Sequence, residues 1–191
     1  MKNIILTVIA VFTFGFANAQ KKFEAKINPL GLFFGLPEIS GEYIVSDHFA
    51  AELTLGFAFG KSSISGTVGN NGTSEKPSQS GFGIKAAAKY YFNPDEGADG
   101  WYGGVYLRQE SLNLSYTNTY SNYDYTSSVF AGGVEFGKKW VWDSGFLIEL
   151  GAGVGRPFSE TRKYSNRDTA YDINYEVGVD FTGKFAVGYR F

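Results

Sequence analysis

The residues that could carry chemistry in this chain are charged side chains at alternate positions of eight segments rich in apolar residues. The acids are Glu24, Glu42, Glu52, Glu110, Glu135, Glu149 and Asp180, and the bases are Lys26, Lys85, Lys89, Arg108, Lys139, Lys184 and Arg190. Since a strand directs successive side chains to opposite faces, this spacing separates a charged face from an apolar face. Charges inside a protein are stable only when they are paired and hydrogen-bonded. The balance of seven acids and seven bases therefore predicts an interior network of ion pairs, with a narrow ion or proton path as the alternative.

No catalytic set is expected around the single histidine, His48. It lies in a predicted turn, Ser46 to His48, and a hydrolase or acyltransferase would need a serine and a carboxylate beside it. The absence of cysteine excludes a thiolate metal site and a cysteine nucleophile. The glycines from Gly151 to Gly155 lie within a predicted strand, which no helix follows, so they do not form a nucleotide-binding loop. The sequence thus predicts no catalytic residue, no cofactor and no metal site.

The composition is unusual for a soluble enzyme. Aromatic residues make up 18% of the chain, with 25 glycines, while charged residues are 19% where about 25% is usual. The mean hydropathy of -0.15 fits a membrane barrel, because only alternate residues of each strand meet lipid. A formal charge of -2 offers no basic face to a nucleic acid, so no nucleic-acid partner is expected.

The first residues have the pattern of a secretory signal peptide. Lys2 precedes the apolar run Ile4 to Phe16, and Ala17-Asn18-Ala19 is a small-x-small cleavage site. The alternative, a retained membrane helix, requires about 20 apolar residues, and this run is shorter. We therefore expect residues 1–19 to be removed after Ala19 and residues 20–191 to form one exported domain. Without another long apolar stretch, membrane insertion would require a closed barrel.

Eight segments alternate in the way expected of long strands. The last, Glu176–Phe191, has apolar side chains at odd positions. It is longer than the about 9 to 11 residues that a strand needs to cross a membrane. The others are Phe23–Phe34 with a bulge at Pro29-Leu30, Glu38–Val45, Phe49–Gly60, Gly81–Phe92, Trp101–Tyr116 with a phase slip near Gln109–Ser111, Val129–Trp142 and Phe146–Phe158. The predicted fold is an all-β, eight-stranded antiparallel up-and-down transmembrane β-barrel.

The predicted connections differ on the two sides of this barrel. Three short turns lie on one side, Ser46–His48, Asn93–Gly100 and Asp143–Gly145, and Gly35–Pro37, Lys61–Ser80, Thr117–Ser128 and Ser159–Asn174 lie on the other. Outer-membrane barrels have short periplasmic turns and longer external loops. On the apolar face, Tyr90, Phe92, Trp140, Trp142 and Tyr189 lie near the strand ends on the turn side. They are expected to form an aromatic girdle at the membrane interface.

Tyrosines are frequent in the predicted external loops. The candidate binding residues are Tyr120, Tyr123, Tyr125, Tyr164 and Tyr171, among serines, threonines and asparagines. Tyrosine in such surroundings is typical of adaptable binding loops, because it offers contact area at low entropic cost. A protein, glycan or lipopolysaccharide ligand would fit this composition. The alternative is that these segments extend the barrel strands or form the outer girdle.

Several short motifs carry a family resemblance. The signal peptide, Lys26-Ile-Asn-Pro-Leu-Gly31, Glu42-Tyr43 and the final Gly188-Tyr-Arg-Phe191 resemble small outer-membrane β-barrel proteins of unknown function from Bacteroidota-type bacteria. The architecture is also similar to OmpX and to the membrane domain of OmpA. This resemblance implies an outer-membrane location among lipid and lipopolysaccharide, and a terminal Phe191 that the barrel-assembly machinery reads. It implies a structural or surface-interaction role, with a narrow pore and a lipid-modifying enzyme as alternatives.

Overall fold

The computed structural model describes residues 22–61, 66–67, 74–75, 77–95, 97–117, 122–166, 169–173 and 178–191. The elements are β1 (Phe23–Ile27), α2 (Pro29–Phe34), β2 (Glu38–Ile44), β3 (Phe49–Lys61), β4 (Gly66–Thr67), β5 (Ser74–Glu75), β6 (Ser78–Tyr91), β7 (Gly100–Thr117), β8 (Asn122–Val141), β9 (Phe146–Asn166), β10 (Thr169–Ile173) and β11 (Asp180–Arg190). The predicted leader lies outside the described residues, so its cleavage stays a prediction.

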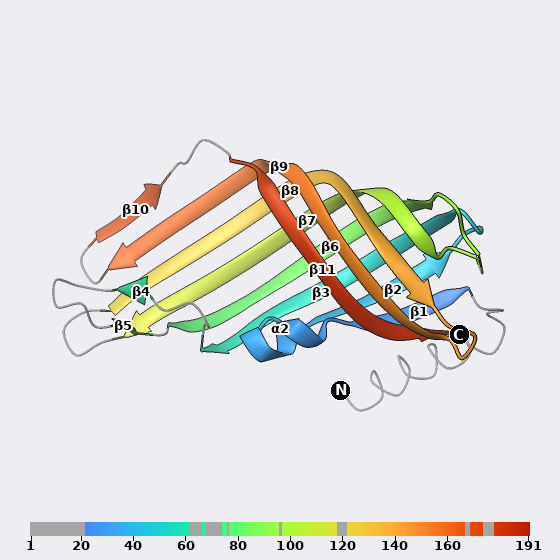
Figure 1. Ribbon diagram of the computed structural model, residues 1–191. Helices are drawn as coiled ribbons and strands as arrows, with labels where there is room; N and C mark the ends of the chain where they lie inside the picture. Colours follow the sequence, from blue (N-terminus) through green and yellow to red (C-terminus); the bar gives the residue numbers. More distant parts are fainter. Residues whose placement is uncertain are drawn as a thin grey trace, which may run out of the picture.

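Eight of the described strands close into an antiparallel barrel (Figure 1). Each of β1, β2, β3, β6, β7, β8 and β9 pairs with the next in this order, β9 pairs with β11, and β11 pairs back with β1. The predicted all-β up-and-down topology is therefore confirmed. Strand β10 pairs with β9 alone, and β4 and β5 form a separate small hairpin.

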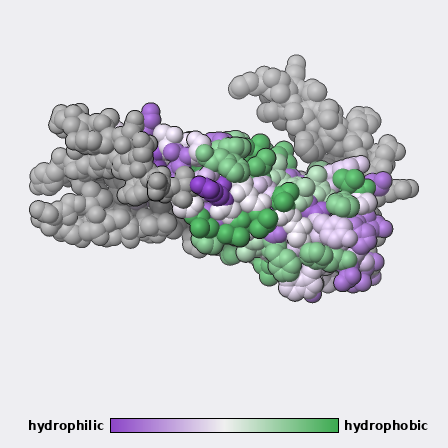
Figure 2. Space-filling view, turned by 90° about the horizontal axis from the view of Figure 1, so that it is seen from above, coloured by the Kyte–Doolittle hydropathy of each residue, from purple (hydrophilic) through white to green (hydrophobic). Residues whose placement is uncertain are grey.

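The alternation in the sequence is the alternation between the inside and the outside of the barrel. In β3, Ala50 and Glu52 are buried, whereas Leu53, Phe57 and Phe59 are exposed. The same division around the barrel leaves many large apolar side chains on its outer surface, and Figure 2 shows broad hydrophobic areas on the wall. No helix among the described residues is long and apolar enough to span a membrane.

A short helix replaces the second half of the first predicted strand. The prediction of one strand from Phe23 to Phe34 with a bulge at Pro29 was wrong, because β1 ends at Ile27 and α2 follows. Asn28 caps this helix by accepting a hydrogen bond from the Gly31 amide at 3.2 Å, and Pro29 occupies the first turn, where its missing N–H costs nothing. Gly35 ends it with φ 69°, a left-handed conformation that glycine adopts readily.

Replacing Asn28 with alanine should destabilise this junction. Its amide nitrogen also donates a hydrogen bond of 2.9 Å to Glu38, so two contacts are lost. We expect the free energy of unfolding in urea to fall by about 0.5–2 kcal/mol, the usual cost of losing a cap. Asn28→Ser is the matched control, because serine keeps the capping oxygen, and it should lose less. Equal losses in both variants would contradict the role of the cap.

The upper parts of β7, β8 and β9 also differ from the prediction. The phase slip near Gln109 is absent, since β7 pairs with β6 and β8 without a shift, and Leu112 and Leu114 therefore lie half-buried on the same face as Glu110. The predicted loops Thr117–Ser128 and Ser159–Asn174 are largely strand. Their threonines and tyrosines favour extended backbone, and backbone pairing with the neighbouring strand continues through them. The start of the last predicted strand, Glu176–Val177, lies outside the described residues.

Candidate functional site

Three carboxylates lie side by side in the lumen near the end where short turns connect the strands. Glu24 is directly opposite Glu42, and Glu42 is directly opposite Glu52. Like charges at opposite positions destabilise a sheet. This row of acids therefore requires cations that reach it from other positions on the barrel wall.

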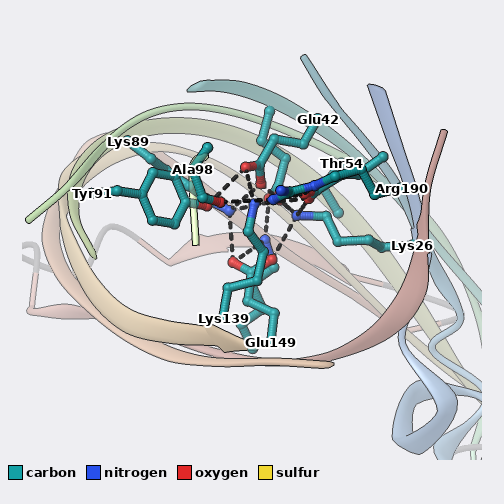
Figure 3. Close-up of polar contacts among 12 residues, drawn as sticks. Lys26, Glu42, Thr54, Lys89, Tyr91, Ala98, Lys139, Glu149 and Arg190 are labelled. Atoms are coloured by element: carbon teal, nitrogen blue, oxygen red, sulfur yellow. Dashed lines mark hydrogen bonds and ion pairs between the residues drawn. The ribbon is translucent and has the colours of Figure 1, made fainter. Parts of the chain in front are cut away.

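Two lysines supply most of that compensation (Figure 3). The Lys26 ammonium group donates to Glu42 at 2.5 Å, to Glu149 at 2.6 Å and to Glu52. Lys89 donates to the same three acids, at 2.7, 2.6 and 2.8 Å. An ammonium group has three N–H donors, so each lysine uses all of them. Oxygens of Glu42, Glu52 and Glu149 lie within 4.8 Å of one another, a spacing that suits a metal ion, but the two ammonium groups already bridge them.

The remaining contacts complete what we call the turn-side cluster. Its members are Glu24, Glu42, Glu52 and Glu149 with Lys26, Lys89, Lys139, Lys184 and Arg190. Lys139 bridges Glu24 at 2.9 Å and Glu42 at 2.6 Å. Arg190 holds Glu24 through two nitrogens and also donates to the carbonyl of Ala98 at 3.0 Å, which joins the last strand to the turn after β6.

A second group of charges lies further along the lumen, and we call it the loop-side cluster. It contains Lys85, Arg108, Glu110, Glu135 and Asp180. Lys85 pairs with Glu135 at 2.9 Å, and Arg108 pairs with Asp180 at 2.5 Å and with Glu110. The structure thus brings all fourteen predicted charged residues into two clusters. Glu110 differs from the predicted buried network, because 48% of its side chain is exposed.

The turn-side cluster fills its part of the lumen. The side chains of Lys26, Lys89, Lys139, Glu24, Glu42, Glu52 and Glu149 are all 0% exposed. An eight-stranded barrel is only just wide enough to be filled by side chains. Among the described residues, the packed acids and bases therefore occupy the lumen at this level.

Three interior tyrosines were missed by the sequence analysis. Tyr91 donates to Glu42 at 2.8 Å and Tyr106 donates to Asp180 at 2.7 Å, so hydroxyl groups join both clusters. The ring of Tyr102 lies beneath Lys89, whose nitrogen is 4.7 Å from the ring centre. The sequence did contain a signal for large inward rings, because glycines occupy inward positions of the neighbouring strands and leave space beside them.

These glycines give the tyrosine rings their space. Tyr102 is opposite Gly137, and Tyr106 is opposite Gly133, in the pairing of β7 with β8. A Cβ atom added to Gly137 would lie 2.5 Å from the hydroxyl oxygen of Tyr102. The rings therefore lie over a glycine surface, which a larger residue would obstruct.

The histidine and the predicted binding tyrosines lie at opposite ends of the barrel. His48 Nδ1 contacts the carbonyl oxygen of Tyr91 at 2.8 Å, and its ring stacks on Tyr90; among the described residues no serine hydroxyl hydrogen-bonds to it. In the extended strands, Tyr125 is paired with Tyr164, and Tyr164 with Tyr171, so three tyrosines occupy one row across β8, β9 and β10. Tyr123 also lies in β8, and Tyr120 lies outside the described residues.

Aromatic side chains gather on the outer wall near the turns. Tyr90, Phe92, Trp140, Trp142 and Tyr189 are 37–47% exposed, and each lies next to other rings or to Lys138. Phe191 packs against Tyr189 with ring centres 5.1 Å apart, and its amide donates to the Phe23 carbonyl at 2.8 Å. This last contact ties the end of the chain to the first strand.

Fold and interior together define a class of protein, the closed eight-stranded antiparallel barrel with ion pairs in its lumen. Residues 4–185 match the family DUF3575, described as a protein of unknown function, and the chain belongs to this family. No curated protein and no solved structure gives a significant match to the chain.

Proposed function

We propose that this chain is an outer-membrane β-barrel with a structural or surface-interaction role, similar in architecture to OmpX and to the membrane domain of OmpA. The observation that carries the proposal is the inverted distribution of side chains. Lys, Glu and Arg residues fill the lumen, while Leu53, Val105 and Phe136 are about half exposed on the outer wall. Soluble proteins almost never bury charges fully unless they are paired, and they keep large apolar patches small. An apolar outer wall around a polar interior is the pattern of barrels in lipid.

Strand length and asymmetry support the same proposal. Strands β7, β8 and β9 have 18, 20 and 21 residues, beyond the about 9 to 11 that cross a membrane. The extra residues lie on the side of the long connections, away from the short turns (Figure 1). They carry the row of Tyr125, Tyr164 and Tyr171, which would stand above the membrane and offer a surface to a protein or glycan ligand.

The proposal includes the route by which the chain reaches its membrane. Residues 1–19 would direct export and be removed after Ala19, and the barrel-assembly machinery would read Phe191 on the turn side. Lipid and lipopolysaccharide would then surround the aromatic girdle. Density fractionation of envelopes, with the protein detected by an antibody, tests this placement directly; recovery with the inner membrane or the soluble fraction would contradict it.

Planar-bilayer conductance of the refolded mature chain distinguishes a plugged barrel from the alternative, a narrow pore. We expect no steady channels, because seven of the nine side chains in the turn-side cluster are 0% exposed at its level of the lumen. Folding is confirmed by a heat-dependent shift in gel mobility. The variant Lys85→Ala/Lys89→Ala is measured beside it. Steady wild-type channels whose ion selectivity changes in the variant would show that the charged interior conducts ions.

A further inference from the structure

The barrel wall is incomplete on one side, at the seam between its first and last strands. Pairing of β1 with β11 ends at Ile27 and Val187. Strand β11 continues to Asp180, held on its other edge by β9. Along that length β1 has given way to α2, which lies beside β11 (Figure 1). Among the described residues, the edge of β11 from Asp180 to Ala186 therefore has no strand beside it.

A cavity of about 270 Å³ opens at this seam. Residues 181–186 of β11 and Leu36, Glu38 and Ser40 border it at the seam, and residues of β3, β6 and β7 line the rest of it. Consecutive strand residues face opposite sides of the wall. Inward-facing Lys184 and outward-facing Phe181, which is 77% exposed, both border the cavity where, among the described residues, no strand pairs with this edge of β11, so the cavity reaches the gap in the wall. Its volume is near the lower end of the about 300–1,000 Å³ usual for small-molecule sites.

The inner part of this cavity is polar and offers positive charge. Lys184 and Lys85 line it, with 10% and 15% of their side chains exposed. The charged residues that line the cavity are three bases, Lys85, Arg108 and Lys184, and two acids, Glu38 and Glu110, so its own lining holds one positive charge in excess. An anionic group placed above Lys184 would balance that excess.

The outer part of the cavity is apolar. Phe181 and Phe185 border it from β11, and Leu36 borders it from the end of α2. Phe181 is 77% exposed and Leu36 is 45% exposed, which leaves both open to the surroundings of the barrel. In lipid, unpaired backbone groups at a strand edge are costly unless a polar partner meets them. The seam therefore suits a molecule with both a polar group and an apolar tail.

We propose that this seam is a lateral binding site for a membrane amphiphile with an anionic head and one acyl chain. The head lies above Lys184 and Lys85, and the chain leaves through the gap between α2 and β11 into the bilayer. The inference rests on the membrane location proposed above and adds a ligand class and an entry route from the lipid. Such a site would let the barrel bind a lipid-derived molecule although its lumen is plugged.

Photolabelling tests this site in the full mature chain refolded into phosphatidylcholine vesicles. The probe is palmitate with a diazirine in its chain, and labelled peptides are mapped by mass spectrometry. We expect saturable labelling of β11 and of the segment from α2 to β2. Unlabelled palmitate should compete at concentrations about tenfold lower than hexadecanol or hexadecylamine, a difference that measures the preference for the anionic head.

Two glycines provide a matched pair of variants. A Cβ at Gly83, inside the cavity, would meet its nearest atoms at 3.7 Å, so Gly83→Leu fills the space without a clash at the backbone. A Cβ at Gly178, outside the cavity, would meet nothing within 4 Å. We expect Gly83→Leu to reduce labelling by about tenfold or more and Gly178→Leu to leave it unchanged.

The outcomes separate this inference from the proposed function. A heat-dependent gel shift and protection from trypsin first establish that each variant has inserted. Inserted barrels whose labelling spreads evenly over β8 and other outer strands, without competition or an effect of Gly83→Leu, would overturn the lateral site and leave the membrane barrel intact. A chain that folds only without lipid would overturn both.

Discussion

Replacing Lys26 with methionine should lower the free energy of unfolding by about 3–5 kcal/mol, the usual cost of removing one partner from a buried ion pair. Lys26 is completely buried and donates to Glu42, Glu52 and Glu149. Methionine preserves much of the volume but none of the charge, so Glu42, Glu52 and Glu149 would each lose a buried hydrogen bond from a cation. Equilibrium unfolding in urea, with the barrel in lipid vesicles, measures the loss.

The matched control is Lys138→Met. Lys138 lies on the outer face, with its nitrogen 5.3 Å from the ring centre of Trp101 and 5.1 Å from that of Trp140. Its loss should cost only about 0.5–1 kcal/mol, as for exposed cation–π contacts. If Lys26→Met were no more destabilising than Lys138→Met, the turn-side cluster would not stabilise the barrel.

A double variant isolates the pairing itself. Lys26→Met/Glu52→Gln removes one charge of each sign from the turn-side cluster. We expect it to be less destabilised than the sum of the single variants, with a coupling of about 0.5–3 kcal/mol. Additive losses would mean that Lys26 and Glu52 act independently, despite their direct contact.

The second large effect is expected at Gly133, where β8 and β9 approach closely. A Cβ there would lie 2.3 Å from the carbonyl oxygen of Val154 and 2.4 Å from the Cα of Gly155. Because both atoms belong to the backbone, neither can move without a shift of the strand. Gly133→Ala should therefore destabilise the barrel by about 1–3 kcal/mol, the usual cost of overpacking. Urea unfolding, followed by tryptophan fluorescence, measures it.

Gly183→Ala serves as the control for this substitution. A Cβ at Gly183 meets nothing within 4 Å, so the added methyl group has room. Alanine has less backbone freedom than glycine in the unfolded chain. The free energy of unfolding of Gly183→Ala should therefore be unchanged or higher by about 0.4–1 kcal/mol. A loss in Gly183→Ala equal to that in Gly133→Ala would show that flexibility, and not the close approach of β9, decides the effect.

Much of the architecture could be predicted from local pattern. Alternation assigned Glu52 and Lys89 to one face and Leu53 and Tyr90 to the other, because side-chain direction in a strand has a period of two residues. The tight connections at Ser46–His48 and Asp143–Gly145 followed from turn residues. Such features depend on a few neighbouring residues, and the order of the eight strands follows once the short connections are known.

Local pattern failed where two structures compete over a short distance. The segment after Ile27 alternates well enough to be a strand, but the cap at Asn28, Pro29 in the first turn and the left-handed Gly35 favour a helix. The tyrosine-rich segments were predicted as loops from their polarity, with extension of the barrel strands as the alternative, and the alternative is confirmed for the described residues. Strand pairing extends through them instead, because each strand supplies hydrogen-bond partners for the next.

The sequence by itself determined the barrel class, the inward charges and the apolar outer wall, since each depends on alternation along one strand. Only the tertiary structure decided which charges pair. Lys26 meets Glu149, far away in the sequence, because closure places β1 and β9 on the two sides of β11, where both face one narrow lumen. The seam beside β11 likewise exists only through the register of β1 against β11, which ends at Ile27. Register and closure are relations between distant strands, and no local pattern contains them.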